Sequence, residues 1–387
     1  MSVTTPLGFR AAGVVAGLKT SGAPDVALVV NDGPDHHAAA VFTTNRVEAA
    51  PVTWSRTVLS DGRADAVVLN SGGANACTGA PGFQDTHRTA EHVGEVLGVS
   101  AGDVVVCSTG LIGERLPMHL LLPGVDSAVD ALAVDGGPAA AQAIMTTDSV
   151  AKTAVVQRDG WSVGGMAKGA GMLAPALATM LVVVTTDAVI AGHHVTEDLD
   201  GVLRAATALT FDRIDSDGCM STNDTVLLLA SGASGVTVDP EDLTDAVTRV
   251  CADLARQLIA DAEGAHHDIA IEVRGAASVD DALEVARSVA RNNLFKCAVF
   301  GNDPNWGRVL AAVGTTQAAF DPTSLDVSMN GVTVCRAGGV GEDRTLVDLT
   351  GREVRVLVDL HAGDDTATVW TNDLTHDYVH ENSAYSS

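Results

Sequence analysis

Residues 164–187 read GGMAKGAGMLAPALATMLVVVTTD. A glycine-rich run with one lysine, Lys168, leads through Pro175 to Thr179, and a β-branched run beginning at Leu181 follows. Such a β-branched run is typical of a buried strand, and the glycines before it predict a flexible loop. A loop joined to a strand at a threonine suits two kinds of site, a phosphate-binding loop and a point where the chain cuts itself.

The phosphate-loop interpretation fits this stretch poorly. The spacing G-x-x-x-x-G-K-[ST] is absent, although residues 169–174 match the relaxed dinucleotide pattern G-x-G-x-x-A. That pattern must follow a strand and open a helix. Here Pro175 and a strand-like run follow instead. A non-catalytic nucleotide-binding module is therefore kept only as an alternative.

Self-cleavage has a chemical rationale. A threonine hydroxyl is a weak nucleophile without a nearby base, and cleavage before Thr179 would place a new α-amino group beside that hydroxyl. Such an amine has a pKa of about 7.7–8.0 and is partly neutral at pH 7, so it can accept the hydroxyl proton. The glycines would permit the strain that exposes the Ala178 carbonyl. Local pattern alone does not separate this reading from a threonine that merely starts a strand.

Composition excludes several classes of function. The chain has 387 residues, 46% of them hydrophobic but only 3% aromatic, so the core must be built from alanine, valine, leucine and isoleucine. Its net charge is −26 and no cluster of lysine and arginine stands out, which argues against nucleic acid and anionic membranes as partners. The longest apolar run, near 173–184, is shorter than the ~20 residues that span a bilayer.

The six cysteines form no C-x-x-C pair. This favours reduced thiols and a cytoplasmic location over a disulfide framework or zinc site. The N-terminal segment has no basic region before its apolar part, so we expect no signal peptide. Cys219 lacks an assignable histidine partner for nucleophilic catalysis, and we expect histidine pairs such as His266–His267 to lie in surface loops.

Short runs rich in valine, isoleucine and leucine predict strands at 25–31, 38–42, 65–70, 103–107, 181–186, 225–230 and 268–273. Helical periodicity predicts helices at 85–97, 126–134, 138–145, 240–262 and 278–292. The two kinds of element do not alternate strictly, which favours stacked sheets with covering helices over a doubly wound parallel sheet. We therefore predict a mixed α/β (α+β) core over 1–270 and a smaller C-terminal α/β domain over 271–387.

The stretch KGAGMLAPALATMLVVVTTDA resembles the self-processing signature of the ornithine acetyltransferase (glutamate N-acetyltransferase) family of the cyclic arginine pathway. Further stretches resemble that family in the expected order: VLNSGGANACTGAPG (68–82), VCSTGLIGERLPM (106–118), IMTTDS (144–149), FDRIDSDGCMSTNDTVLLLASG (211–232), FGNDPNWGRVLAAVG (300–314) and TNDLTHDYVHENSAYSS (371–387). Together they cover most of the chain.

The resemblance implies autoproteolysis between Ala178 and Thr179, giving an α chain of 1–178 and a β chain of 179–387. It also implies a layered αββα sandwich of the N-terminal-nucleophile type, an α2β2 heterotetramer, and a C-terminal tail that returns to the active site. No metal or organic cofactor is implied.

Roles follow position by position from the resemblance. Thr179 would be the nucleophile, and Thr109 and Gly110 would form the oxyanion hole. The substrate-binding residues would be Thr146, Lys168, Thr179, Glu263, Asn382 and Ser387. Thr147 is an alternative to its neighbour at the first of these positions.

The implied reaction is a ping-pong transfer of acetyl from N2-acetyl-L-ornithine to L-glutamate through an acetyl-threonine ester. Some family members also use acetyl-CoA as donor, and no residue here decides that point. A related amidohydrolase or aminopeptidase, which would release the acyl group to water, is the alternative within enzymes.

Overall fold

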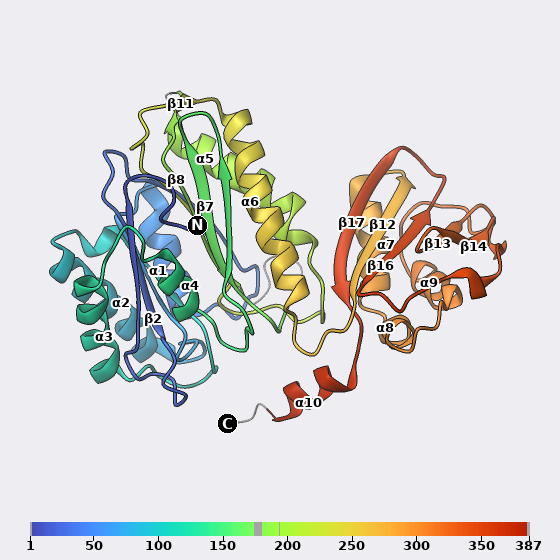
Figure 1. Ribbon diagram of the computed structural model, residues 1–387, viewed down its shortest axis with the longest axis horizontal. Coiled ribbons are helices and arrows are strands. Elements are labelled where there is room, and N and C mark those ends of the chain that lie inside the picture. The colour runs from blue at the N-terminus through green and yellow to red at the C-terminus, as the bar shows by residue number, and fades with distance from the viewer. Residues whose placement is uncertain (1, 174–179, 193, 385–387) are drawn as a thin grey trace. The chain divides into compact units, whose positions relative to one another are not determined.

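The structure is a computed structural model that describes residues 2–173, 180–192 and 194–384 (Figure 1). Ala178, Thr179 and Ser387 therefore lie outside the described residues. The chain divides into two compact units. The first comprises Met1–Asp212 and Cys219–Leu258, and the second comprises Arg213–Gly218 and Ile259–Ser387. The division at residue 270 into a core and a C-terminal domain stays a prediction.

Two sheets form the centre of the first unit. One sheet has the order β1 (Phe9–Val14), β2 (Val26–Asn31), β4 (Ala66–Asn70) and β5 (Val104–Ser108). The other has the order β3 (His37–Phe42), β10 (Thr225–Ala230), β8 (Leu181–Thr186), β7 (Ser162–Lys168) and β6 (Lys152–Gln157). A small ribbon pairs β9 (Val189–Ile190) with β11 (Thr237–Val238). Strands β2, β4, β5, β8 and β10 are buried along their whole length, as expected for continuous apolar runs covered on both faces.

The two sheets face each other across one apolar cluster. That cluster joins alternate residues of both sheets, such as Val29 and Leu69 with Val183 and Leu227, and includes α4 (Gly137–Ala143). Helices α2 (Gly79–Leu97) and α3 (Met118–Asp130) pack on the other face of the first sheet. Helices α5 (Val195–Leu209) and α6 (Pro240–Ala260) pack against the second sheet (Figure 1). The predicted αββα layering is confirmed.

Helix α1 (Ala50–Val58) covers the edge of the first sheet at β5. The Ser55 hydroxyl donates to the Val106 carbonyl oxygen (2.7 Å) and accepts from the Val106 N–H (3.0 Å). The Trp54 indole N–H donates to the Val104 carbonyl oxygen (3.1 Å). These side chains satisfy backbone groups that an edge strand leaves exposed.

Part of the predicted glycine loop is in fact strand β7, and every residue of β7 is buried. A Cβ added to Gly165 would lie 2.8 Å from Val250 and 3.0 Å from Leu254 of α6, and one added to Gly164 would lie 2.3 Å from the Ser2 carbonyl oxygen. These glycines therefore make room for close packing rather than for flexibility. The loop prediction was wrong for residues 164–168.

The second unit is a six-stranded sheet with helices on one face. Its order is β15 (Gly339–Val340), β14 (Val332–Arg336), β13 (Asp326–Met329), β16 (Glu353–Asp359), β12 (Asp268–Ala276) and β17 (Asp365–Asn372). The helices on that face are α7 (Val279–Ala290), α8 (Asn293–Phe300) and α9 (Trp306–Val313), while α10 (His376–Ala384) has no buried residue. Alternate β12 residues Ile269, Ile271 and Val273 point into the same core as Val285 and Val289 of α7. The alternation matches a sheet with one covered face.

Among the described residues, no helix combines the length and the apolar character that crossing a membrane requires.

Candidate functional site

The turn after β5 carries Thr109 and Gly110. Thr109 is buried; its N–H donates to the Asn70 carbonyl oxygen (3.0 Å), and its own carbonyl accepts from the Gly73 N–H (3.0 Å). Gly110 has a φ of 134°, and a Cβ added there would lie 2.7 Å from the Gly73 nitrogen. Only glycine fits such a position. The backbone after β4 therefore fixes the turn that presents the predicted oxyanion pair.

Lys168 ends β7 and is only 1% exposed despite its charge. Its ammonium Nζ donates to Thr109 Oγ1 over 3.3 Å. The lysine thus occupies an acceptor position of that hydroxyl, whose own proton can point to another acceptor. One predicted substrate residue and one predicted oxyanion residue, from the two different sheets, are in contact.

A buried carboxylate, Asp148, organises the surroundings of Lys168. Its Oδ1 accepts from Lys152 Nζ (2.7 Å) and from the Gly169 N–H (2.6 Å), and its Oδ2 accepts from the Thr146 N–H (2.9 Å). Burial alone would raise the pKa of Asp148. The charges of Lys168 and Lys152, with the hydrogen bonds from Lys152 and Thr146, outweigh burial and lower the pKa to about 2. Asp148 is therefore ionised at neutral pH.

The loop after α4 carries both candidate threonines. Thr146 is half-buried and is joined to Asp148 through its backbone N–H, whereas Thr147 is exposed. The buried carboxylate therefore holds the backbone of Thr146 directly. Its substrate-binding role stays a prediction.

The chain returns to described residues at Met180, directly after Thr179. The Met180 N–H donates to Asp224 Oδ1 (3.1 Å), and the Met180 carbonyl accepts from the Thr225 N–H (3.1 Å). In the antiparallel pairing of β7 with β8, Lys168 lies opposite Leu181. The residue predicted to be the nucleophile is thus covalently attached to a backbone held beside Lys168 and Asp224.

Asp224 is fully buried, and burial raises the pKa of its carboxyl well above the ordinary range. The Met180 N–H, the charge of Lys168 and the hydroxyls of Ser221 and Thr43 oppose that rise without cancelling it. Within the described residues, Asp224 Oδ2 has no hydrogen-bond partner of good geometry. The pKa values of Asp148 and Asp224 are thus shifted in opposite directions although both carboxyls are buried.

Sequence reasoning missed four residues of this region: Asp148, Lys152, Asn223 and Asp224. Asn223 joins the two sheets, because its side-chain amide donates to the carbonyl oxygens of Ala74 (2.6 Å) and Ser108 (2.9 Å). A signal was present in the sequence. Charged or amide residues directly at the start of buried apolar strands, as in NDTVLLLA and KTAVV, need buried partners.

Two further predicted residues, Glu263 and Asn382, meet in the second unit. The Asn382 side-chain amide donates to Glu263 Oε2 (3.0 Å) and to the Tyr378 carbonyl oxygen (3.0 Å). Glu263 follows α6, and Asn382 lies on α10. The structure therefore brings Glu263 and Asn382 into contact with each other. Their contact with substrate stays a prediction.

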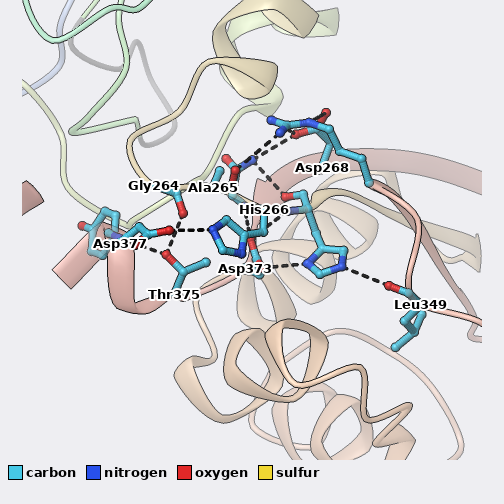
Figure 2. A network of polar contacts seen from close by, with 12 residues as sticks. Gly264, Ala265, His266, Asp268, Leu349, Asp373, Thr375 and Asp377 are labelled. Atoms are coloured by element: carbon cyan, nitrogen blue, oxygen red, sulfur yellow. Dashed lines mark hydrogen bonds and ion pairs between the residues drawn. The ribbon is translucent and has the colours of Figure 1, made fainter. Parts of the chain in front are cut away.

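A polar network fastens the chain after Glu263 to the segment that leads into α10 (Figure 2). The Thr375 hydroxyl donates to the Gly264 carbonyl oxygen (2.6 Å). The N–H groups of His266 and His267 donate to Asp373 Oδ1 (3.0 and 2.9 Å), and the His267 ring contacts Asp373 Oδ2 (2.7 Å). His267 is buried, so the prediction that this pair lies in a surface loop was wrong for His267. Spacing in the sequence did not indicate this contact, because Asp373 lies 106 residues from His267 along the chain.

Glu263 also lines a solvent-open hollow of about 440 Å³ in the second unit. Its other charged walls are Asp217, Arg291, Lys296 and Asp373. Burial lowers the pKa of Lys296, and the carboxylates of Asp217, Asp215 and Asp373 oppose that shift. The hollow thus offers charges of both signs.

The dinucleotide alternative is not supported by the local fold. Strand β7 precedes the glycine pattern, and β8 pairs with it in antiparallel register. In the part of 169–180 that the structure describes, no helix follows β7. The motif requires a parallel β–α–β unit, which is absent here.

Comparison with known proteins gives a consistent family match. The ArgJ family model matches residues 10–387. The arginine biosynthesis bifunctional protein ArgJ of Streptomyces coelicolor is 66% identical over 387 residues, and that of Thermobifida fusca is 65% identical, each covering 100% of both chains. A solved structure of ornithine acetyltransferase complexed with ornithine from Mycobacterium tuberculosis is 57% identical, with a TM-score of 0.45, over 46% of this chain and 96% of the other.

Proposed function

The chain belongs to the ArgJ family and is an acyltransferase, and from this premise we propose that it transfers acetyl from N2-acetyl-L-ornithine to L-glutamate through an ester on Thr179. The proposal includes autoproteolysis between Ala178 and Thr179. It places the protein in arginine biosynthesis, as the names of its relatives suggest.

The contact between Lys168 Nζ and Thr109 Oγ1 carries this proposal (3.3 Å). It joins a cation suited to a substrate carboxylate to a hydroxyl suited to an oxyanion. Both lie beside the residue that begins β8, because Lys168 is in register with Leu181. A site for acyl transfer from an N-acylated amino acid needs these two functions close to the nucleophile.

In the first half-reaction, the Thr179 Oγ attacks the acetyl carbonyl carbon, and the hydroxyl proton passes to the α-amino group of the same residue. The Thr109 hydroxyl and the Gly110 N–H donate to the oxyanion that forms. The C–N bond then breaks, the departing ornithine nitrogen takes the proton, and the acetyl group remains as an ester on Thr179. In the second half-reaction, the amino group of L-glutamate attacks that ester and regenerates the hydroxyl.

Substrate recognition would use charges of both signs. Lys168 would bind the α-carboxylate common to both substrates, and Thr146 would line the same position. Glu263, Asn382 and Ser387 would complete the substrate contacts, in line with the family resemblance. Assembly as α2β2, use of acetyl-CoA as a second donor, and the cytoplasmic location stay predictions.

The Asp224 carboxyl supports this scheme by holding Met180, the residue bonded to Thr179, through its N–H (3.1 Å). Burial raises the pKa of that carboxyl, so it takes up a proton more readily than an exposed aspartate does.

The test combines intact mass under denaturing conditions with product analysis. We expect two fragments, the second beginning at Thr179, and formation of N-acetylglutamate from acetylornithine and glutamate. Thr179→Ala should give one uncut chain of 39.5 kDa and no transfer. A Thr179→Ala protein that is still cut and active would overturn the proposal, and release of free acetate without acetylglutamate would identify a hydrolase instead.

A further inference from the structure

Two fully buried lysines act on the carboxylate of Asp148. Lys152 is 0% exposed and Lys168 is 1% exposed. Lys19, half-buried nearby, feels the charges of Asp25 and Asp148, and its Nζ donates to the Met145 carbonyl oxygen (2.6 Å).

The geometry distinguishes the two fully buried lysines. Lys152 Nζ lies 2.7 Å from Asp148 Oδ1 and also donates to the Val150 carbonyl oxygen (3.3 Å). Lys168 Nζ instead reaches the hydroxyl of Thr109, a predicted oxyanion residue (3.3 Å). Asp148 simultaneously holds the N–H groups of Thr146 and of Gly169, the residue after Lys168.

We propose that Asp148 and Lys152 are positioning residues: their ion pair holds the Thr146 loop and the end of β7, and it keeps the charge of Asp148 from competing with a substrate carboxylate for Lys168. Neither residue needs to touch the substrate in this role. The inference rests on the proposed function, because it assigns the carboxylate of the acetyl donor to Lys168.

The physical argument concerns competition in a buried site. Opposite charges attract far more strongly in a low-dielectric interior than in water, so an unpaired Asp148 would bind Lys168. With Lys152 present, the carboxylate already has a close cationic partner. Loss of the Lys152 charge should therefore weaken binding of an anionic substrate, and loss of both charges should largely restore it.

The decisive variant is Lys152→Gln, because the amide can still donate to Asp148 but carries no charge. Two donors are compared, N2-acetyl-L-ornithine and its α-carboxamide, which lacks the negative charge. For the carboxylate donor we expect the KM to rise about tenfold with kcat within about threefold of wild type. For the carboxamide donor we expect kcat/KM to stay within about threefold.

Rescue provides the second readout. The double variant D148N/K152Q should bring the KM of the carboxylate donor back to within about threefold of wild type, as coupled neighbours allow. If K152Q does not fold, Lys152→Met serves as the uncharged single variant and D148N/K152M as its double, since substitution of both members of a buried pair is often tolerated. The matched control is Arg158→Met, which removes a cation paired with Asp245 at the far end of the β6–β7 hairpin. It should change neither donor's kinetics.

Equal losses on both donors, or a double variant as impaired as K152Q, would overturn the inference and leave the proposed function standing. A wild-type protein that forms no acetylglutamate would instead overturn the proposed function. In that case calorimetric titration of the same proteins with the two donors tests the ion pair alone. A K152Q protein that binds the carboxylate donor as tightly as wild type would then refute it.

Discussion

Asp148 in the first unit lies 2.7 Å from Lys152, and Asp373 in the second unit lies 2.7 Å from the His267 ring. Both carboxylates are fully buried, and both also accept two backbone N–H groups. In these respects the two networks are built alike. They differ in what surrounds the pair.

Around Asp373 the donors and acceptors match. The His267 ring has the Asp373 carboxylate on one side and the Leu349 carbonyl oxygen on the other (3.0 Å), so both ring nitrogens have a polar partner (Figure 2). Around Asp148, by contrast, Lys168 brings a second fully buried cation. The second network therefore joins one aspartate to one histidine, whereas in the first two buried lysines act on one aspartate.

The largest expected effect is on kcat and concerns Thr109, the residue that links the first network to catalysis. Thr109→Val keeps the shape of the side chain but removes both the acceptor of Lys168 and an oxyanion donor. We expect kcat to fall by about 10²–10³-fold, the usual cost of one oxyanion-hole donor, with the free energy of unfolding within about 1 kcal/mol of wild type. Steady-state kinetics and urea unfolding measure the two.

Thr109→Ser is the matched control, since it retains the hydroxyl and should keep kcat within about tenfold. If Thr109→Val kept the wild-type kcat, Thr109 would have no role in the reaction. The Lys168 contact would then be purely structural, and the contrast between the two networks would lose its functional meaning.

The sequence predicted the elements with continuous apolar runs well. The strands expected at 181–186 and 225–230 are β8 and β10 with the same bounds, and the helix expected at 240–262 is α6. Helices α1 and α5 were not predicted, and α3 begins at Met118, ahead of the predicted 126–134. The apolar residues of α5 are spaced for a helix but interrupted by threonine and alanine, so its packing against β3 decides its form.

The candidate site was predictable only through motifs. Thr109, Gly110, Lys168 and Thr146 came from the resemblance, and the structure places the first three in one contact region. Asp148 and Lys152 are four residues apart and read as solvated loop charges. Their burial depends on β7 and the loop after α4 closing over them, which is long-range packing that no local pattern encodes.

The next largest effect is a change in the free energy of unfolding at acidic pH. The pKa of Asp148 is lowered to about 2 in the folded protein, against about 3.9 in an unfolded chain. The folded state therefore binds the proton more weakly, so the stabilisation is present above pH ~4 and is lost as pH falls through 2. It amounts to about 2 kcal/mol at neutral pH. The destabilisation caused by Asp148→Asn should thus shrink by about 1 kcal/mol between pH 7 and pH 3.

Urea unfolding at pH 7, 5 and 3 measures this change. Asp245→Asn is the control, because the Arg158–Asp245 pair is at the surface and contributes little. A difference between wild type and D148N that is constant or grows toward pH 3 would contradict an ionised Asp148.

The smallest effect is expected within the second network. Its His267–Asp373 pair is buried, whereas its His266–Asp377 pair is exposed. The His266 ring contacts Asp377 over 2.7 Å, but the two side chains are 48% and 62% exposed. Exposed ion pairs contribute little because water and salt screen them, so Asp377→Asn should change the free energy of unfolding by less than about 0.5 kcal/mol. Asp373→Asn, four residues earlier, should cost about 2 kcal/mol or more, because it removes the charge facing a buried ring. Urea unfolding at low and at high salt compares the two variants. Equal costs would mean that burial does not set the strength of this network, and the comparison with Asp148 would have to rest on net charge alone.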